Sequence, residues 1–277
     1  MIQALKISVS VVTFDTPMDE LEACLLSLFK SLGYCQDYCC RLTVSIYVVN
    51  NGDEPLAGFI SSIKTSAPRL DGFKIDLLEG QGNVGYGAAI NLTLGPGDFA
   101  FRLLLNSDVT LHPMAISEAL KYLDSNNSVV AVSPMCVNKE QVRQHLCKRY
   151  PTLLDLALRG LAPKILSDFF TNRLAKYEMR ELPINKPSVG IPLISGCFIL
   201  CRASALTKVS GFDSSYFLYF EDFDLSLRLR TIGELAFLPS VKITHEGGFA
   251  ARKGIYHILI FARSAFRFFN KFGWKWR

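Results

Sequence analysis

Apolar runs alternate with amphipathic segments over the first part of the chain. Residues 7–13, 42–49 and 73–78 are continuous β-branched and apolar runs, as in the buried strands of a parallel sheet. Between them, residues 19–32 and 56–65 repeat their apolar side chains at helical spacing. This strand–helix alternation predicts an α/β fold with a doubly wound sheet, whose ligand site lies at the carboxyl ends of the strands.

The same pattern continues through most of the remaining chain. Further strands are expected at residues 99–105, 129–132, 197–201, 235–239 and 241–244. Further helices are expected from the glycine-rich stretch 80–91 to about residue 94, at 114–123, and from Glu221 onward. The chain is therefore expected to form one domain over 1–277, with halves at 5–110 and 111–250.

Two segments depart from this alternation. Residues 138–187 mix basic and apolar side chains with four prolines, which predicts short amphipathic helices in an insertion. Residues 251–277 are basic and predict a helix at 254–272 with a wide apolar stripe, followed by Trp274 and Trp276. Such a stripe is typical of a core helix, but its aromatic content and basic flank also fit a bilayer interface.

Composition narrows the class of protein. The net charge of +5 is concentrated near the C-terminus, which suits an acidic partner such as a lipid surface, phosphates or nucleic acid. No run approaches the roughly 20 apolar residues of a spanning helix, and the first residues do not resemble a secretory signal. We therefore expect a cytoplasmic protein with eight reduced cysteines, although the group Cys35, Cys39 and Cys40 gives weak support to a zinc site.

Three carboxylates follow directly after a run of aromatic residues. Tyr216, Phe217, Tyr219 and Phe220 precede Glu221, Asp222 and Asp224. Acids in the first turn of a helix complement its dipole, and this is one explanation for them. The other is an active-site acid at a helix N-terminus that faces a pocket with aromatic walls.

Other polar residues follow buried strands. Asp108 comes directly after the strand at 99–105 and could hold a divalent cation against a diphosphate, or form a turn. His245 ends an apolar strand before two glycines, where it could be a metal ligand or a structural histidine. The glycine-rich stretch 80–91 lacks the lysine of a P-loop and follows the third strand, which disfavours ATP and NAD sites.

The motifs in this order resemble one family. They are VVTFD at 11–15, VVNNGD at 48–53, GQGNVGYGAAIN at 80–91, LLLNSDV at 103–109, GFDSSYFLYFEDFDLSLR at 211–228 and HEGG at 245–248. This set resembles the family 2 inverting glycosyltransferases of GT-A fold, in particular the rhamnosyltransferase-like branch of bacterial O-antigen and polysaccharide biosynthesis. The resemblance covers residues 5 to about 270 and is weakest over 138–187.

The resemblance implies a role for each matching position. The nucleotide-sugar would be held by Thr13, Asp15, Asn50, Asn51, Asp53, Asn83, Gly85, Asn91, Asn106 and Asp108. Asn50 and Asn106 stand where the family usually has aspartates. A divalent cation, Mg²⁺ or Mn²⁺, would therefore rest mainly on Asp108, His245 and the diphosphate. Asp222 matches the catalytic base. Glu221, Asp224, Tyr219 and Arg228 would orient the acceptor, or the acids would pair with Arg228 and Arg230.

The implied function is transfer of a sugar, best matched by L-rhamnose from its dTDP form, onto a polyprenyl-diphosphate-linked glycan. The C-terminal helix would hold the protein at the inner face of the cytoplasmic membrane. A UDP-galactofuranose or UDP-hexosamine donor is the alternative within the class. A non-catalytic glycan- or nucleotide-binding subunit is the alternative outside it. Nucleic acid is not expected as a partner, because the phenylalanines of 254–272 fall on the apolar side of the helix.

Overall fold

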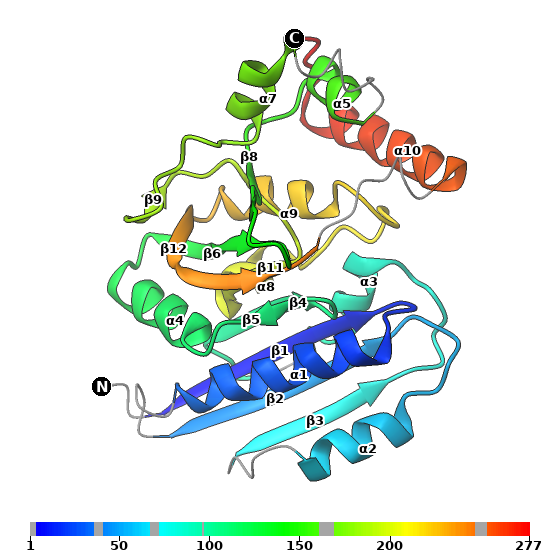
Figure 1. Cartoon of the computed structure of the whole chain (residues 1–277), viewed down its shortest axis with the longest axis vertical. Helices are drawn as coiled ribbons and strands as arrows, with labels where there is room; N and C mark the ends of the chain where they lie inside the picture. The colour runs from blue at the N-terminus through cyan, green and yellow to red at the C-terminus, as the bar shows by residue number, and fades with distance from the viewer. Residues whose placement is uncertain (1–3, 36–40, 67–71, 96, 161–168, 247–253) are drawn as a thin grey trace.

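The computed structural model describes residues 4–35, 41–66, 72–95, 97–160, 169–246 and 254–277 (Figure 1). The strands are β1 (Leu5–Thr13), β2 (Leu42–Asn50), β3 (Phe73–Leu78), β4 (Phe101–Asn106), β5 (Thr110–Leu111), β6 (Val129–Val137), β7 (Arg143–Gln144), β8 (Cys147–Lys148), β9 (Ser188–Val189), β10 (Leu193–Ile194), β11 (Phe198–Arg202) and β12 (Glu234–Thr244). The helices are α1 (Met18–Gly33), α2 (Ala57–Ser66), α3 (Tyr86–Asn91), α4 (Ala115–Ser125), α5 (Leu153–Gly160), α7 (Thr171–Tyr177), α8 (Ala203–Lys208), α9 (Glu221–Leu229) and α10 (Ile255–Phe272).

One mostly parallel sheet runs through both halves of the chain, in the order β3-β2-β1-β4-β11-β6-β12-β5. Strand β1 lies parallel to β2 and β4, with Thr13 opposite Asn50 and Val12 opposite Asn106. Strand β11 is antiparallel to its neighbours β4 and β6, while β12 is parallel to β6. The carboxyl ends of β1, β2, β4 and β12 therefore meet at one edge of the sheet, as the α/β alternation predicts.

Helices cover both faces of this sheet. Alternate residues of a strand point to opposite faces, so Val11 and Val12 belong to different cores. One core contains residues of α1, α2 and α4, and the other contains residues of α3, α8 and α9. The two faces are both buried, which is why the strands read as continuous apolar runs rather than as alternating ones.

The predicted strands and helices are present, with shifted ends. The two strands expected at 235–239 and 241–244 are one strand, β12, whose pairing with β6 shifts register between Leu238 and Lys242. Pro239 cannot donate a ladder hydrogen bond, so it marks this irregularity rather than a strand end.

The described cysteines at 24, 35, 136, 147, 197 and 201 are buried free thiols. Some residues named in the sequence analysis lie outside the described residues, namely Cys39, Cys40, Arg252, Lys253 and the two glycines after Glu246.

The insertion at 138–187 contains short helices, as predicted, and also short strands. Helices α5 and α7 contact each other, β7 pairs with β6, and β8 pairs with β10 in a separate two-stranded sheet. These pairings connect the insertion at two places to strands that lie outside it or border it, β6 and β10. Helices α5, α7 and α10 gather at the end of the molecule opposite β3 and α2 (Figure 1).

The C-terminal helix has one buried face and one exposed face. On one face, Phe268 and Phe269 are fully buried against Tyr216 and Phe220. Tyr216 is therefore a core residue, and of the four aromatic side chains in the 216–220 run only Tyr219 and Phe217 keep appreciable exposure. The opposite face leaves large apolar side chains exposed, namely Ile255, Tyr256, Leu259 and Phe266. No helix in the described ranges is long and apolar enough to cross a membrane.

Asp224 fastens α9 to α10. Its side chain is fully buried and pairs with Arg228 Nε at 2.5 Å and with Lys271 Nζ at 2.6 Å. Arg228 also donates to the backbone carbonyls of Val209 and Gly211. Asp224 and Arg228 thus belong to a buried ion-pair network. This corrects the prediction that they contact the acceptor and favours the alternative, in which the acid pairs with Arg228.

Breaking this network should unfold the protein more easily. Removing one member of a buried ion pair leaves an uncompensated charge, so Asp224→Ala should lower the free energy of unfolding by about 3 kcal/mol or more. Asp213→Ala is the matched control, since Asp213 also pairs with Lys271 but with a side chain 29% exposed. It should cost about 1 kcal/mol or less. Urea unfolding of both variants checks this, and equal losses would contradict the assigned role.

Candidate active site

Asp222 stands at the N-terminus of α9 in a fixed orientation. Its Oδ2 accepts a hydrogen bond from the Gly196 backbone N–H at 3.0 Å, and its Oδ1 accepts one from the Phe223 N–H at 2.9 Å. The preceding residues Tyr219 and Phe220 have φ of 68° and 64°, in the left-handed region that bulky side chains rarely occupy. Strain of this kind is kept where the surrounding structure imposes it, often beside an active site.

Glu221 and Asp222 form a pair of neighbouring acids. Glu221 is 6% exposed, and its Oε2 has no hydrogen-bond partner among the described residues. Burial and the adjacent Asp222 raise the pKa of Glu221 to about 8. Burial also raises the pKa of Asp222, although the backbone N–H groups of Gly196 and Phe223 oppose the shift. Each oxygen of Asp222 keeps a lone pair, so the carboxylate can still accept a proton.

Asp108 and His245 meet at the carboxyl edge of the sheet, although 137 positions separate them in sequence. Asp108 follows β4, His245 follows β12, and Asp108 Oδ2 lies 3.3 Å from His245 Nε2. Burial alone would lower the pKa of the imidazole, but Cys197 and the hydrogen bond to Asp108 raise it above its ordinary value. The structure thus brings together the two residues that the sequence offered as metal ligands.

This pair fits a divalent cation. Two ligands at right angles with bonds of about 2.1 Å lie about 3 Å apart, which matches the separation of these two atoms. Three or more His, Cys, Asp or Glu side chains that could hold an ion do not gather anywhere in the described part of the chain. Diphosphate oxygens and water would therefore supply the remaining ligands, and His245 would bind as the neutral imidazole.

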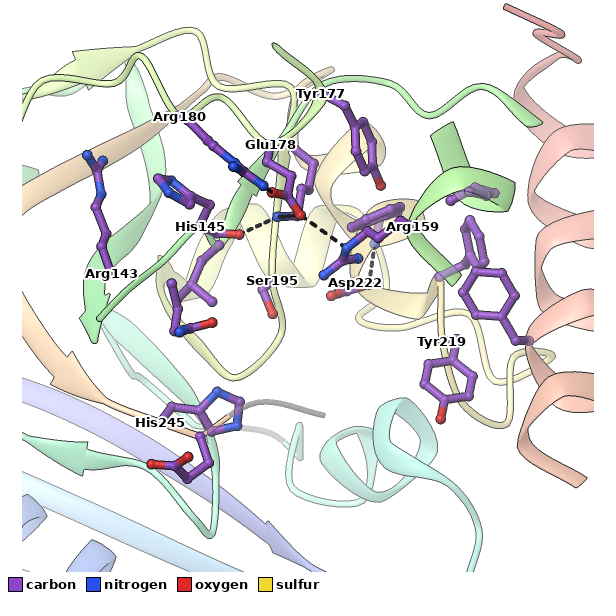
Figure 2. Close-up of a pocket in the computed structure, with 18 of the residues that line it drawn as sticks. Arg143, His145, Arg159, Tyr177, Glu178, Arg180, Ser195, Tyr219, Asp222 and His245 are labelled. Carbon is purple, nitrogen blue, oxygen red and sulfur yellow. Dashed lines mark hydrogen bonds and ion pairs between the residues drawn. The ribbon is translucent and has the colours of Figure 1, made fainter. Parts of the chain in front are cut away.

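A cavity of about 730 Å³ connects these groups (Figure 2). Asp222, Tyr219 and Ser195 line it together with His245, through which Asp108 joins the site. The cavity is also lined by residues of the insertion, including Arg143, His145, Arg159, Tyr177, Glu178 and Arg180 (Figure 2). The predicted base and one predicted metal ligand, His245, thus line one cavity, and the other ligand, Asp108, contacts His245.

A second hollow, of about 390 Å³, lies at the ends of β2 and β3. It is lined by Asn50, Gly52, Asp53, Pro55, Glu79, Gly80 and Gly82. Asn50 holds its shape, because its amide donates to the Glu54 carbonyl at 2.8 Å and its oxygen accepts from the Gly52 N–H at 2.9 Å. Asp15 reaches the same place, since a Cβ on Gly52 would lie 3.1 Å from Asp15 Oδ1. The polar rim of this hollow suits a nucleoside.

The remaining predicted nucleotide residues organise the backbone around this hollow. Asn51 donates its N–H to the Thr13 carbonyl at 2.8 Å and its side-chain amide to the Gly85 carbonyl at 3.2 Å. Asn83 Oδ1 accepts the Gly85 N–H at 3.1 Å. Gly85 has a φ of 84°, and a Cβ there would lie 2.1 Å from the Phe217 carbonyl oxygen, so only glycine fits.

Two predicted residues have structural roles here. Asn91 donates to the Phe212 carbonyl at 2.8 Å and accepts from the Phe212 N–H at 2.9 Å, so it anchors the segment before α9 rather than the floor of the nucleotide site. Asn106 uses its backbone N–H to bond the Cys197 carbonyl at 3.0 Å. Through Cys197, which follows Gly196, the end of β4 is held next to the residue that orients Asp222.

Sequence reasoning missed several residues of the site. Tyr86 donates its hydroxyl to the Gly196 carbonyl at 2.7 Å, and a Cβ on Gly196 would lie 3.3 Å from both Tyr86 and Asp222. The Ser195–Gly196 pair before an apolar strand was the available signal for this close approach. No sequence signal marked four other residues, because only the folded insertion and β3 bring them to the site. They are Glu79, Lys148, Arg159 and Glu178.

The class of protein follows from a comparison with known families. Residues 8–209 match the profile described as glycosyl transferase family 2, and the chain belongs to this family. The fold agrees with the expected GT-A architecture of a mostly parallel sheet flanked by helices.

Individual relatives are more distant. The chain is 29% identical over 155 residues to rhamnosyltransferase WbbL of Escherichia coli K12, covering 54% of this chain and 53% of that protein. It is 28% identical over 186 residues to the N-acetylglucosaminyl-diphospho-decaprenol L-rhamnosyltransferase of Mycobacterium tuberculosis, covering 62% of this chain and 59% of that protein. The chain thus spans somewhat more than half the length of these curated relatives.

Solved structures share the fold at low sequence identity. The mannosyltransferase PcManGT from Pyrobaculum calidifontis, solved with GDP-Man and Mn²⁺, has a TM-score of 0.59 at 16% identity over 94% of this chain and 64% of that one. GalNAc-T7, solved with UDP, GalNAc and Mn²⁺, has a TM-score of 0.58 at 13% identity over 87% of this chain and 43% of that one. At these identities the likeness extends to the fold alone.

Proposed function

We propose that this chain is an inverting glycosyltransferase that moves a sugar from a nucleotide diphosphate onto a lipid-linked glycan. The observation that carries the proposal is one cavity lined by a fixed carboxylate, Asp222, and by His245, which pairs with Asp108. A base on one side and a cation site on the other are what a single displacement at an anomeric carbon requires.

Each residue would perform one part of the reaction. Asp222 accepts the proton of the acceptor hydroxyl, and its raised pKa makes it a stronger base than an exposed carboxylate. Asp108 and His245 would hold Mg²⁺ or Mn²⁺, whose charge would stabilise the departing diphosphate. The two structural neighbours named above contain Mn²⁺, which supports a divalent cation here. The nucleoside would occupy the hollow at Asn50 and Asp53.

The donor we favour is dTDP-L-rhamnose, because both curated relatives are named as rhamnosyltransferases. The acceptor we favour is a glycan on a polyprenyl diphosphate, as the mycobacterial relative is named for such a compound. UDP-galactofuranose and UDP-hexosamine are alternative donors for the same residues. A non-catalytic binding subunit would have no need for an oriented Asp222 beside a cation site, so we place it second.

A panel of nucleotide-sugars tests the proposal. With Mn²⁺ or Mg²⁺ present, the protein should release nucleoside diphosphate from dTDP-L-rhamnose, and more rapidly with a polyprenyl-diphosphate glycan added. Release from a UDP-sugar alone would keep the reaction class and change the donor. Binding of nucleotide-sugars without any release, with or without acceptor, would instead establish the non-catalytic subunit.

The rate of transfer should depend on pH in a specific way. Because burial raises the pKa of Asp222, kcat/KM should fall as the pH drops through a value above the ordinary carboxylate range near 4. Because the pKa of Glu221 is raised to about 8, this residue is neutral over the acidic range in which Asp222 titrates, so Glu221→Gln should leave the acid limb in place. A pH–rate profile of both proteins checks this, and a limb displaced to lower pH in the variant would show that Glu221 is charged where Asp222 titrates.

The exposed face of α10 would hold the protein at a membrane surface. Leu259 is 63% exposed beside Tyr256 and Ile255, and Arg263 lies one turn further on. Burying one leucine contributes about 1.5–3 kcal/mol, so Leu259→Glu should weaken binding to phosphatidylglycerol vesicles about tenfold or more. Leu26→Glu, at an exposed leucine of α1, is the matched control. Vesicle co-sedimentation checks both, and an equal loss in the two variants would contradict the assignment.

A further inference from the structure

The insertion forms a cationic wall beside Asp222 that the reaction chemistry does not use. Three cations converge on one carboxylate, Glu178: its oxygens lie 3.6 Å from Lys148 Nζ, 3.1 Å from Arg159 Nε and 2.7 Å from Arg180 Nη2 (Figure 2). Arg143 lines the same cavity and donates to a backbone carbonyl, that of Leu182. The wall therefore carries more positive than negative charge.

Asp222 and Glu246 also line the cavity, so acids reduce this excess of positive charge without cancelling it. Glu181 pairs with Arg149, and Asp155 pairs with Arg173, so both are matched within the insertion. On the opposite side of the cavity, Glu221 favours its neutral form because of burial and Asp222. Lys148 is only 5% exposed. Burial and the nearby Arg159 lower its pKa to about 8, as expected for a cation held among like charges.

Backbone hydrogen bonds fix the wall next to the base. Strand β8, which carries Lys148, pairs with β10, and the N–H of Ile194 in β10 bonds Ser226 Oγ of α9 at 3.1 Å. Ser195 follows and donates its N–H to the Leu146 carbonyl at 3.0 Å. The charge of Arg159 opposes the burial that raises the pKa of Asp222, and the two residues lie side by side in Figure 2. A molecule whose hydroxyl reaches Asp222 would thus carry its neighbouring groups along the wall.

The remaining wall of the cavity is apolar. Leu156 of α5, Phe223 of α9 and Phe261 of α10 line it, with Tyr219 and Phe220. Phe261 lies on α10 within two turns after the exposed Ile255, Tyr256 and Leu259. One side of the cavity therefore suits phosphates, and the other suits a hydrocarbon chain that continues toward the exposed face of α10.

We propose that this cavity binds the acceptor through its diphosphate, with Lys148, Arg159, Arg180 and Arg143 holding the phosphates and the α5–α10 side holding the first units of the lipid chain. This inference rests on the proposed function and deepens it, because it assigns the acceptor's diphosphate to the insertion. The diphosphate of the donor has its own place at Asp108 and His245. A free phosphate would not require the apolar side.

Direct binding tests the proposal without turnover. Farnesyl diphosphate is the probe, titrated into the protein by calorimetry in the absence of donor and divalent cation, with inorganic pyrophosphate and farnesol as the two partial probes. Farnesyl diphosphate should bind more tightly than either. Pyrophosphate binding equally well would assign the wall to a free phosphate source, and farnesol binding equally well would remove the phosphate contacts. Either result would overturn the proposal.

Single-charge variants locate the contact. Arg159 and Arg180 are 37% and 43% exposed, so R159Q and R180Q should fold. Each removes a charge-assisted contact and should weaken farnesyl diphosphate binding about tenfold or more. Arg149→Gln is the matched control from the same insertion, since Arg149 pairs with Glu181 and does not line the cavity. Equal affinities in all three variants and the parent chain would refute the assignment.

Kinetics separate this proposal from the proposed function. In R159Q and R180Q the KM for a polyprenyl-diphosphate glycan should rise about tenfold, while the KM for the donor stays constant. A rise confined to the donor KM would place the donor's diphosphate on the wall and overturn the proposal. A chain that releases nucleoside diphosphate but fails to bind farnesyl diphosphate would keep the proposed function and lose only this inference.

Discussion

Replacing Asp222 by asparagine should reduce kcat by about 10²–10⁴-fold while leaving the Kd of the nucleotide-sugar close to its original value. The amide keeps the size of the carboxylate and can still accept the Gly196 N–H through its oxygen, so the local backbone should persist. It cannot, however, accept the proton of the acceptor hydroxyl. The loss should therefore appear in the chemical step and not in donor binding.

Single-turnover transfer and donor titration measure these two quantities separately. Asp124→Asn, at an exposed position of α4, serves as the control for the loss of one carboxylate and should leave both unchanged. Unfolding curves of Asp222→Asn should overlay those of the parent chain. If the variant transferred sugar at a near-normal rate, another group would have to be the base.

Replacing Asp108 by alanine should remove most of the Mn²⁺-dependent gain in donor affinity, about 100-fold or more if the cation contributes several kcal/mol. Asp108 would supply one of the two proposed protein ligands, and its removal would leave His245 as the single one. Affinity for the donor without Mn²⁺ should change little, because the proposed nucleoside contacts lie at Asn50 and Asp53.

Titration of the donor with and without Mn²⁺ checks the effect. Asp124→Ala is again the control, at an exposed position distant from the sheet edge. Retention of the full Mn²⁺ response by Asp108→Ala would show that the cation, if one acts, is held elsewhere. The two variants should also differ from each other, since Asp222→Asn keeps the Mn²⁺ response and Asp108→Ala loses it.

Much of the fold could be predicted from local pattern, because parallel strands buried on both faces leave an unmistakable apolar signature. The errors arose where local pattern and tertiary contacts differ. The aromatic run at 216–220 predicts the wall of a pocket, but one of its members, Tyr216, packs against α10, 40 or more residues later. Asp224 has the same chemistry as Asp222 in the sequence, and only its burial against Lys271 separates their roles.

By itself, the sequence determined the order of strands and helices, the polar residues that end the strands, and the glycines where the backbone must approach closely. These properties depend on neighbours within a few positions, so a short stretch of sequence is enough to predict them. The tertiary structure decided that Glu221 and Asp222 line a cavity while Asp224 does not, that Asp108 meets His245, and that the insertion turns its cations toward Asp222. Those outcomes depend on contacts between distant segments, whose energies no short stretch of sequence contains.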